Sequence, residues 1–394
     1  MERAKIRILV VDDSMVFRES VARGLASDPG IEVVGKASDP IEAMDKIKQL
    51  KPDVMTLDVH MPKMNGIEFL KKLMAENPMP VVVVSSVSDN VFDALNAGAV
   101  EFVTKPTEGR KVELFTKELI IKAKIASVAK LKIGTQKPKT TSTPVQPKQS
   151  PMAKSDIKPI DFGSTRTSAA KSQTQTSAPI SQSIKTQNIQ SSSMLPKLNI
   201  AASKKDYVIA IGASTGGTEA ILAVIKDLPK ETPGIVIVQH MPPGFTAMYA
   251  QRANKACKMS VKEAEEGDYI ETGKILIAPG ALQMKVKKDA RGYYVSCKPG
   301  EKVSGHAPSV DVLFESVAQT IGGKSVGIIL TGMGSDGAKG LLSMKKTGAY
   351  TIGQDEKSCV VYGMPRVSYN IGAVGVQSDL FNIPNVLINY LNKS

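Results

Sequence analysis

Residues 8–14 read Ile-Leu-Val-Val-Asp-Asp-Ser, a short apolar run that ends in the carboxylates of Asp12 and Asp13. A second run, residues 54–57, leads into Asp58. Open α/β sheets gather their ligands beyond the carboxyl ends of their strands. The two runs therefore predict strands that bring three carboxylates to one edge of a sheet.

Two further runs end in groups that complement these acids. Residues 81–84 are four valines followed by Ser85, and residues 102–104 are followed by Lys105. A hydroxyl and an ammonium can neutralise the charge of a phosphoryl group in transfer. A single aspartate in such a place also fits a helix cap or a turn residue. Five polar residues at successive strand ends instead favour a phosphorylatable switch.

Asp58 is the best acceptor in this switch, because it stands alone at a strand end and faces the acidic pair. Carboxylate oxygens suit Mg²⁺, which also takes a phosphoryl oxygen as a ligand. An acceptor carboxylate can attack a phosphoryl group and form an aspartyl phosphate. Asp12, Asp13 and Asp58 are therefore the candidate metal ligands.

Strands and helices alternate five times before residue 126, which is typical of a parallel, doubly wound sheet. The predicted strands are 6–11, 32–36, 54–58, 81–85 and 101–103, and the predicted helices are 15–26, 40–49, 66–75, 90–97 and 109–126.

A polar segment, residues 126–203, follows this domain. It is rich in Ser, Thr, Gln, Lys and Pro, so it cannot bury enough apolar surface to offset its ordering entropy. Residues 130–200 hold ten lysines and one arginine but two aspartates and no glutamate, a net charge of +9. Most of the +13 of the chain therefore belongs to a predicted disordered tether, which argues against nucleic acid as the partner.

The alternation resumes after the tether and predicts a second α/β domain. Its predicted strands are 207–211, 235–239, 273–278, 293–297, 325–330 and 349–353, with a hairpin between the third and fourth. Its predicted helices are 219–226, 245–256, 310–321, 338–347 and 384–391. The expected domains are thus 1–125, 126–203 and 204–394, within a chain of 394 residues.

Residues 212–217, Gly-Ala-Ser-Thr-Gly-Gly, form a G-x-S-x-G turn directly after the first of these strands. Such a turn exposes a nucleophilic serine, but the same glycines also fit a phosphate-binding loop or a plain tight turn. His240 ends the next strand, and Asp336 follows the strand at 325–330. Ser214, His240 and Asp336 at neighbouring strand ends match a nucleophile, its base and an orienting acid.

The chain order Ser, His, Asp differs from the order Ser, Asp, His of the α/β-hydrolases, which argues against that fold. His306 follows a loop rather than a strand, so it is expected to line the substrate cleft or to cap the helix that starts near Ser309. The three cysteines are widely spaced and predict neither a zinc site nor a disulfide framework. We expect them to pack as small apolar groups.

Residues 4–125 resemble the response-regulator receiver family. Its motifs are matched at residues 11–14, 58–66 and 104–106. The resemblance implies a flavodoxin-like five-stranded parallel sheet and phosphorylation of Asp58 by a histidine kinase.

The same resemblance implies Mg²⁺ held by Asp13, Asp58 and the backbone carbonyl of His60, with Asp12 helping through water. Lys105 and the hydroxyl of Ser85, or of the neighbouring Ser86, then act on the phosphoryl group.

Residues 205–390 are similar to the catalytic domain of the chemotaxis protein-glutamate methylesterases, the CheB family. The matching motifs are 211–217, 239–242, 278–280, 305–314 and 330–337. At position 307 this chain has alanine where the family usually has arginine. The resemblance implies a doubly wound, mostly parallel sheet, with Ser214 attacking γ-glutamyl methyl esters of methyl-accepting chemotaxis receptors.

In this resemblance His240 is the base and Asp336 orients it, while the backbone N–H of Met333 helps to stabilise the oxyanion. Thr215 and His306 belong to the same cleft. Deamidation of receptor glutamines is implied as a second activity of the same acyl-enzyme, and no cofactor is expected for the esterase reaction. The receiver is expected to block the cleft until Asp58 is phosphorylated.

Two other classes of protein compete with this interpretation. A DNA-binding response regulator needs a recognition helix after the tether, where glycine-turned strands are expected instead. A non-catalytic adaptor need not retain Ser214, His240 and Asp336 together. No apolar stretch reaches the ~18 residues of a membrane span, and no signal-peptide pattern is present, so we expect a cytoplasmic protein without membrane insertion.

Overall fold

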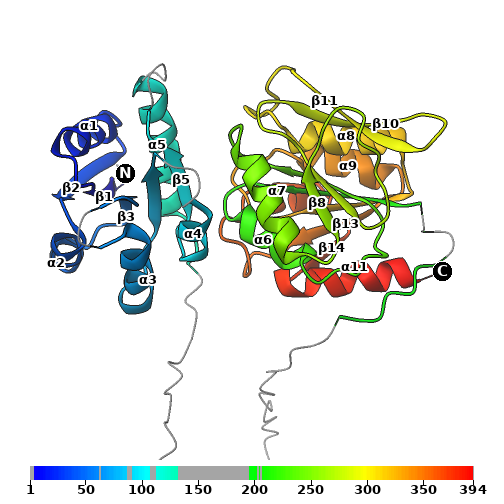
Figure 1. Cartoon of the computed structure of the whole chain (residues 1–394), viewed down its shortest axis with the longest axis horizontal. Helices are drawn as coiled ribbons and strands as arrows, with labels where there is room; N and C mark the ends of the chain where they lie inside the picture. The colour runs from blue at the N-terminus through cyan, green and yellow to red at the C-terminus, as the bar shows by residue number, and fades with distance from the viewer. Residues whose placement is uncertain are drawn as a thin grey trace, which may run out of the picture. The chain divides into compact units, whose positions relative to one another are not determined.

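The first sheet of the computed structural model is parallel, with its strands in the order β2-β1-β3-β4-β5 (Figure 1). The structure describes residues 4–61, 64–86, 91–106, 112–131, 195–201, 204 and 206–393. The strands are β1 (Ile6–Val11), β2 (Ile31–Ala37), β3 (Val54–Asp58), β4 (Val81–Ser85) and β5 (Glu101–Thr104). The helices are α1 (Met15–Ala26), α2 (Pro40–Leu50), α3 (Gly66–Glu76), α4 (Val91–Asn96) and α5 (Val112–Ser127).

Both faces of this sheet are buried, as is usual for a parallel sheet with helices on each side. Successive residues of β1 point to opposite faces, so they enter two different cores. Ile8 and Val10 pack in one core with α1 and α5. Leu9 and Val11 pack in another core with α2 and α3. In Figure 1, α1 and α5 accordingly lie on the other side of the sheet from α2 and α3.

The second sheet is also parallel and has seven strands among the described residues, in the order β14-β13-β12-β6-β7-β9-β8. Its strands are β6 (Val208–Ala213), β7 (Ile235–Gln239), β8 (Ser260–Glu263), β9 (Lys274–Ile277), β12 (Ser325–Ile329), β13 (Tyr350–Gln354) and β14 (Val376–Ser378). A separate antiparallel hairpin consists of β10 (Gln283–Lys288) and β11 (Tyr293–Lys298).

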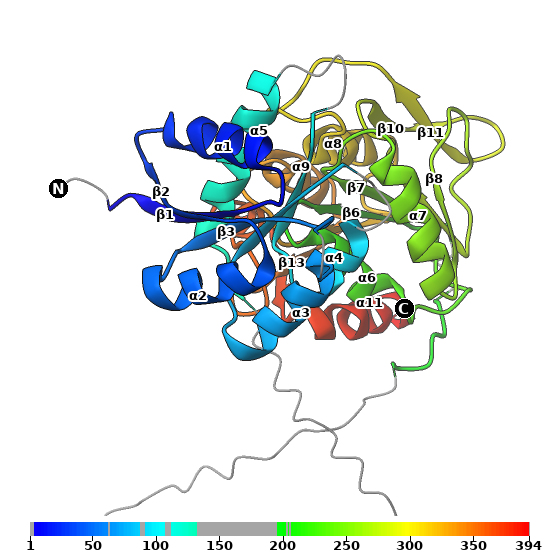
Figure 2. The same cartoon turned by 60° about the vertical axis from the view of Figure 1, so that its left-hand side comes forward.

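Helices cover both faces of the second sheet (Figure 2). They are α6 (Gly217–Ile225), α7 (Phe245–Ala256), α8 (Val310–Thr320), α9 (Ala338–Lys346), α10 (Met364–Asn370) and α11 (Ile383–Asn392), with the short 3-10 helix η2 (Leu380–Asn382). Ile209 and Ile211 of β6 share a core with α6, α7 and α11. Val208 and Ala210 share another core with α8, α9 and α10.

Strand order reverses once in each sheet, and each reversal marks the place where ligands bind in open α/β sheets. In the first sheet it falls between β1 and β3, which lead to Asp12 and Asp58. In the second it falls between β6 and β12, which lead to Ser214 and Asp336. The fold therefore builds one site at each switch point.

The predicted fold class is confirmed for both sheets. The predicted strands at 273–278 and 293–297 exist, but they belong to different sheets. β9 extends the large sheet beside β7, whereas β11 pairs with β10. Most of the predicted tether, residues 132–194, lies outside the described residues. Within the described part of the chain, no helix is both long and apolar enough to cross a membrane.

Residues just before β6 are held against the C-terminal helix. The buried Lys204 donates from Nζ to the backbone oxygens of Tyr390 and Lys393, and its ammonium lies 4.3 Å from the Tyr390 ring centroid. Carbonyls in the last turn of a helix have no partner within the helix, and a cation there is favourable. Lys204 thus closes the end of α11.

Replacing Lys204 with methionine keeps the apolar stem but removes the donor to both carbonyls. We expect the free energy of unfolding to fall by about 1–3 kcal/mol, because buried acceptors lose their partner. Chemical unfolding followed by circular dichroism measures this loss. Lys255→Met, at an exposed position on α7, is the matched control. Equal stability of the two variants would contradict the assigned role.

Candidate active site

Ser214 lies in the turn between β6 and α6, at the carboxyl edge of the second sheet. Its N–H donates to Thr331 O at 3.0 Å, and its own backbone oxygen accepts from Gly217 N at 2.7 Å. Gly216 has φ 73° at the start of α6, a conformation that glycine adopts at little cost. The turn therefore holds Ser214 by backbone contacts, as a strand-to-helix nucleophile turn requires.

His240 follows β7, and Asp336 lies in the loop after β12. Nε2 of His240 lies 2.8 Å from Oδ2 of Asp336, and the two side chains are 7% and 2% exposed. A carboxylate only accepts hydrogen bonds, so Nε2 carries the proton. Nδ1 is buried without a hydrogen-bond partner among the described residues. Its lone pair is therefore available to accept a proton.

The start of α8 holds Asp336. Oδ1 accepts from Ser309 Oγ at 2.7 Å and from Asp311 N at 3.1 Å, while Oδ2 also accepts from Val310 N at 2.7 Å. Burial by itself raises the pKa of Asp336, but the hydrogen bonds from His240, Ser309 and Val310 outweigh it and leave the pKa below its usual value. Asp336 is thus a fixed, ionised acceptor for His240.

The predicted cleft residues Thr215 and Met333 lie in the Ser214 turn and in the loop after β12, respectively. Thr215 is buried, and its backbone oxygen accepts from Thr331 Oγ1 at 3.0 Å. Met333 directly follows Gly332, where a Cβ atom would stand 2.8 Å from Ser214 Cβ. Only glycine permits this approach. The peptide that follows Gly332 is therefore carried close to the serine.

His306 does not cap a helix, so that alternative is wrong. The N-cap of α8 is Ser309, whose hydroxyl accepts from Val312 N. The His306 ring instead stacks on the His240 ring, with centroids 3.6 Å apart and planes at 11°. Burial lowers the pKa of His306 to about 4, with further lowering from His240 and Lys302, while Asp336 acts in the opposite direction.

Acid should destabilise the fold through His306. Since its pKa of about 4 in the fold lies below the ordinary 6.5, the unfolded chain takes up the proton first. The stability contribution is complete above pH 6.5 and is lost as the pH falls from there through about 4. By about pH 4.5 the loss amounts to about 2 kcal/mol.

His306→Phe removes this titration while keeping a planar ring. The free energies of unfolding of wild type and His306→Phe are measured near pH 7 and near pH 4.5. They should therefore diverge only at the lower pH. A parallel loss in the two proteins would assign the acid sensitivity to other groups.

Three supporting residues of this site were missed from the sequence. Gln239 Nε2 donates to Ser214 O at 2.9 Å, Thr331 ties Thr215 to Val361, and Ser309 holds Asp336. Gln239 and Thr331 are polar residues at or just after the ends of apolar strands, the same signal that led to His240. Ser309 carried no such signal, because its role depends on an approach between two loops.

The acidic cluster of the first sheet has the predicted membership. Carboxylate oxygens of Asp12, Asp13 and Asp58 all lie within 4.8 Å of one another. Asp12 and Asp58 are each 3% exposed, and Lys105 Nζ lies 2.8 Å from an oxygen of each. Burial is the main reason that the pKa of Asp12 is raised, and Asp58 adds to it against the opposing effect of Lys105. Three close carboxylates, two of them buried and one exposed, offer the oxygen ligands that fit Mg²⁺.

The remaining predicted residues surround this cluster. Ser85 is buried at the end of β4, and its backbone oxygen accepts from Lys105 N at 2.8 Å. His60 N lies 3.2 Å from Asp58 Oδ1, which places the His60 peptide beside the Asp58 carboxylate. Pro62 and Lys63 of the same motif lie outside the described residues.

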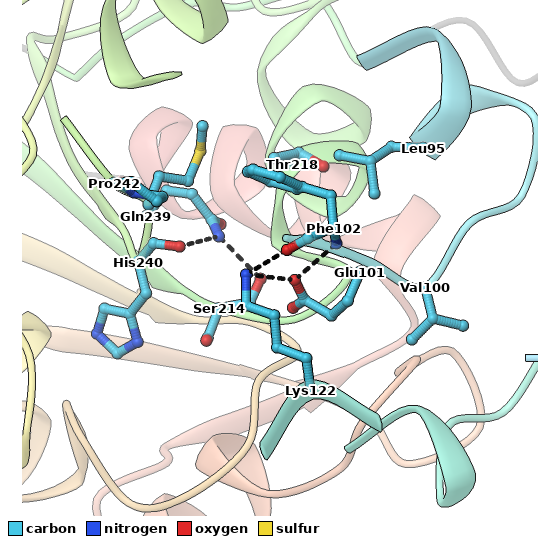
Figure 3. Close-up of a pocket in the computed structure, with 12 residues that line it drawn as sticks. Leu95, Val100, Glu101, Phe102, Lys122, Ser214, Thr218, Gln239, His240 and Pro242 are labelled. Carbon is cyan, nitrogen blue, oxygen red and sulfur yellow. Dashed lines mark hydrogen bonds and ion pairs between the residues drawn. The ribbon is translucent and has the colours of Figure 1, made fainter. Parts of the chain in front are cut away.

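Both sheets belong to one compact unit, residues 1–133 and 195–394. Within it, a cavity of only about 20 Å³ lies beside Ser214 and His240 (Figure 3). Glu101, Phe102 and Lys122 of the first sheet and α5 line its other side. Such a volume holds about one water molecule, so the cavity cannot admit a glutamyl side chain.

The contacts around this cavity are polar and aromatic. Lys122 Nζ donates to Phe102 O at 2.6 Å and lies 3.3 Å from Glu101, as the dashed lines of Figure 3 indicate. The Phe102 ring lies 4.8 Å from the Phe245 ring of α7. Nη2 of Arg252 on α7 donates to Asn96 Oδ1 and also to Glu219 Oε1, the latter at 2.8 Å. The ring contact and the Arg252 contact join α7 to β5 and to α4.

The cysteines offer no competing nucleophile in the described structure. Burial raises the pKa of Cys257 to about 11 and that of Cys297 to about 12, so both thiols stay protonated near neutral pH. Cys359 is buried as well. These positions agree with the predicted packing as small apolar groups.

Two family models match the chain: the response regulator receiver domain at residues 8–116 and the CheB methylesterase at residues 209–387. A protein-glutamate methylesterase/protein-glutamine glutaminase 2 of Syntrophomonas wolfei is 49% identical over 395 residues, which cover 100% of both chains. A protein-glutamate methylesterase/protein-glutamine glutaminase of Salmonella typhimurium is 40% identical and covers 98% of this chain and 97% of its own length.

Among solved structures, the chain is similar to the CheB methylesterase catalytic domain of Thermotoga maritima, at 36% identity and a TM-score of 0.46. That match covers 47% of this chain and 98% of that one. The full-length identity to curated relatives decides the family. The chain belongs to the protein-glutamate methylesterase/protein-glutamine glutaminase family, with a receiver domain before its CheB methylesterase domain.

Proposed function

We propose that this protein hydrolyses γ-glutamyl methyl esters of chemoreceptors and deamidates receptor glutamines, with Ser214 as nucleophile, His240 as base and Asp336 as orienting acid. The observation that carries the proposal is the buried 2.8 Å contact between His240 Nε2 and Asp336 beside the Ser214 turn. Three neighbouring strand ends, those of β7, β6 and β12, supply the three residues.

The first half of the reaction forms an acyl-enzyme. Ser214 Oγ attacks the ester carbonyl carbon while His240 Nδ1 takes the hydroxyl proton. Asp336 keeps the Nε2–H tautomer and stabilises the imidazolium that forms. The tetrahedral intermediate then collapses, the C–O bond to the methoxy group breaks, and His240 returns the proton to give methanol. For a glutamine side chain the leaving group is ammonia.

The second half repeats these steps with water. His240 Nδ1 removes a proton from water, which attacks the acyl carbon and releases Ser214 and a glutamate carboxylate. In both halves the developing oxyanion needs donors. The N–H of Met333 is the candidate, because Gly332 brings this peptide close to Ser214. One such donor is typically worth about 10²–10³ in turnover.

The reaction is tested on the receptor itself. Membranes with methylated receptors are incubated with the protein, and receptor peptides are then mapped by mass spectrometry. We expect loss of the methyl group from specific glutamyl esters and conversion of specific glutamines to glutamates at the same class of position. Receptor peptides that keep both modifications unchanged would overturn the proposed function.

The receiver domain is proposed as the input to this hydrolase. A chemotaxis histidine kinase is the expected phosphodonor, Asp58 the acceptor, and Ser85 and Lys105 the groups that respond to the phosphoryl group. Asp13, Asp58 and the backbone carbonyl of His60 would hold Mg²⁺, with Asp12 assisting through water. The ion supplies charge neutralisation during phosphoryl transfer. We expect this activity in the cytoplasm, together with the proposed kinase.

Unphosphorylated receiver is proposed to keep Ser214 inaccessible. The support is the cavity of about 20 Å³ between Ser214 and the group Glu101, Phe102 and Lys122. Phosphorylation at Asp58 would release this cover and expose the cleft. The second domain then hydrolyses its substrate only when the chemotaxis kinase is active.

Weakening one covering contact should raise the unstimulated rate. Arg252→Ala removes the hydrogen bond to Asn96 and the contact with the Phe92 ring, 5.6 Å away. Each is worth about 1 kcal/mol, so we expect an increase of about fivefold or more. Methanol release without phosphodonor measures it. Arg291→Ala, which loses an exposed arginine over Tyr269 in the same domain, should leave that rate unchanged. No increase for Arg252→Ala would argue against the cover.

A further inference from the structure

His306 is presented to the site by a tight two-residue turn. Val303 N donates to His306 O at 3.0 Å, and His306 N donates back to Val303 O at 2.9 Å. Ser304 and Gly305 between them have φ values of 53° and 84°, which a two-residue turn of this hand requires. Gln283 Nε2 donates to His306 O at 3.1 Å. The backbone around the ring is therefore held independently of the ring itself.

The His306 ring covers one face of His240. Centroids 3.6 Å apart and planes at 11° mean full face-to-face contact. The edge of His240 is meanwhile held by Asp336 at 2.8 Å. A hydrogen bond along one edge leaves the ring able to rock about that bond, whereas a flat group against its face prevents the rocking. The two contacts together fix both the tilt and the direction of Nδ1.

The neutral state of the His306 ring suits its position against His240. Burial, His240 and Lys302 lower its pKa to about 4, so the ring is neutral when the base is at work. A neutral ring does not repel the imidazolium that His240 becomes during turnover, and an aromatic face attracts a cation. A charged side chain in the same position would oppose each proton transfer to His240.

We propose that His306 is a positioning residue that acts through His240, holding the face of the base so that Nδ1 stays aimed at Ser214. This inference rests on the proposed roles of Ser214 and His240. In this role His306 makes no contact with the substrate, whereas a residue that only lines the cleft would do so. A flat aromatic ring without any titratable nitrogen is then sufficient at position 306.

The kinetic test compares His306→Ala, His306→Gln and His306→Phe in the full chain with phosphodonor and Mg²⁺. We expect Ala and Gln to lower kcat for methanol release by about tenfold with KM unchanged, in line with the worth of an aromatic pair. Phe should restore most of the loss. Val303→Ala, which trims an exposed side chain in the same turn, is the matched control and should retain full activity.

An unchanged kcat with a raised KM, or a Phe variant as slow as the Ala variant, would overturn the proposal. The first result would mean that His306 binds substrate, and the second that its nitrogen atoms are required.

A spectroscopic test needs no turnover, so it stays informative even where the proposed function fails. The chain has only three histidines, so ring-labelled histidine gives a spectrum that single variants assign. Stacking should shift the carbon-bound ring protons of His240 upfield. We expect this shift to vanish in His306→Ala and to persist in His306→Phe. A His240 signal that is the same in wild type and His306→Ala would contradict the stack, whatever the activity.

Discussion

Replacing Ser214 with alanine is expected to lower the rate of methanol release from methylated receptors by at least about 10⁴-fold. The attacking oxygen is lost, and what remains is catalysis by the oxyanion donors and binding alone. Asp336→Asn should cost about 10⁴ as well, because an amide NH₂ facing His240 Nε2 favours the wrong tautomer. Initial rates of methanol formation at saturating phosphodonor measure both losses.

Non-additivity distinguishes a catalytic unit from three separate structural residues. The double variant Ser214→Ala with Asp336→Asn should be no slower than Ser214→Ala alone. Asp379→Asn is the control of matched chemistry: it caps η2 through Phe381 N, a task that asparagine performs equally well. Activity within tenfold of wild type in Ser214→Ala would remove this serine from the mechanism.

Asp58→Asn should abolish the response to a small phosphodonor with Mg²⁺ while leaving the unstimulated rate in place. A closed form populated to about 99% leaves about one molecule in a hundred active, so full release gives about 100-fold activation. The variant has no carboxylate oxygen to attack the phosphoryl group, and so remains closed. Rates with and without phosphodonor, measured on the same preparation, give the ratio directly.

Asp53→Asn is the matched control for this prediction. Asp53 lies just before β3, at the opposite end of the strand from Asp58, where its carboxylate accepts from Arg7 N at 2.8 Å. We expect this variant to be activated like wild type. Activation of Asp58→Asn by phosphodonor would move the switch to another residue and contradict the receiver assignment.

Much of both sites was predictable, because strand ends are visible in the sequence. An apolar run that stops at a polar residue marks the carboxyl end of a buried strand. Asp58, Ser214 and His240 all stand at such ends, and the parallel direction of the strands brings each of them to the carboxyl edge of its sheet. The resemblance of the motifs then supplied roles that strand ends alone leave open.

Contacts between loops were not predictable in the same way. His306 reaches His240, and Ser309 reaches Asp336, through turns whose geometry depends on backbone bonds such as that between Val303 and His306. No periodicity in the sequence records such an approach. The cavity lined by Ser214, Phe102 and Lys122 likewise joins distant parts of the chain.

Some missed elements did leave a trace. β10 alternates buried Met284 and Val286 with exposed Lys285 and Lys287, which is the pattern of a half-buried strand. β14 is only three residues long and offers too little pattern to recognise. α10 begins at Met364, after the N-cap Gly363, and has proline in its first turn. Proline there is a helix-start signal, but it is easily overlooked in a short helix beside glycine turns.

Phosphorylation of Asp58 is proposed to expose an esterase built on Ser214. This proposal is tested most directly by methanol release from methylated receptor membranes in three samples: the intact protein, the intact protein with phosphodonor and Mg²⁺, and a fragment of residues 204–394. We predict a slow rate for the first and fast rates for the second and third, the fragment being indifferent to phosphodonor. Equal rates in all three samples would mean that the receiver does not control the esterase.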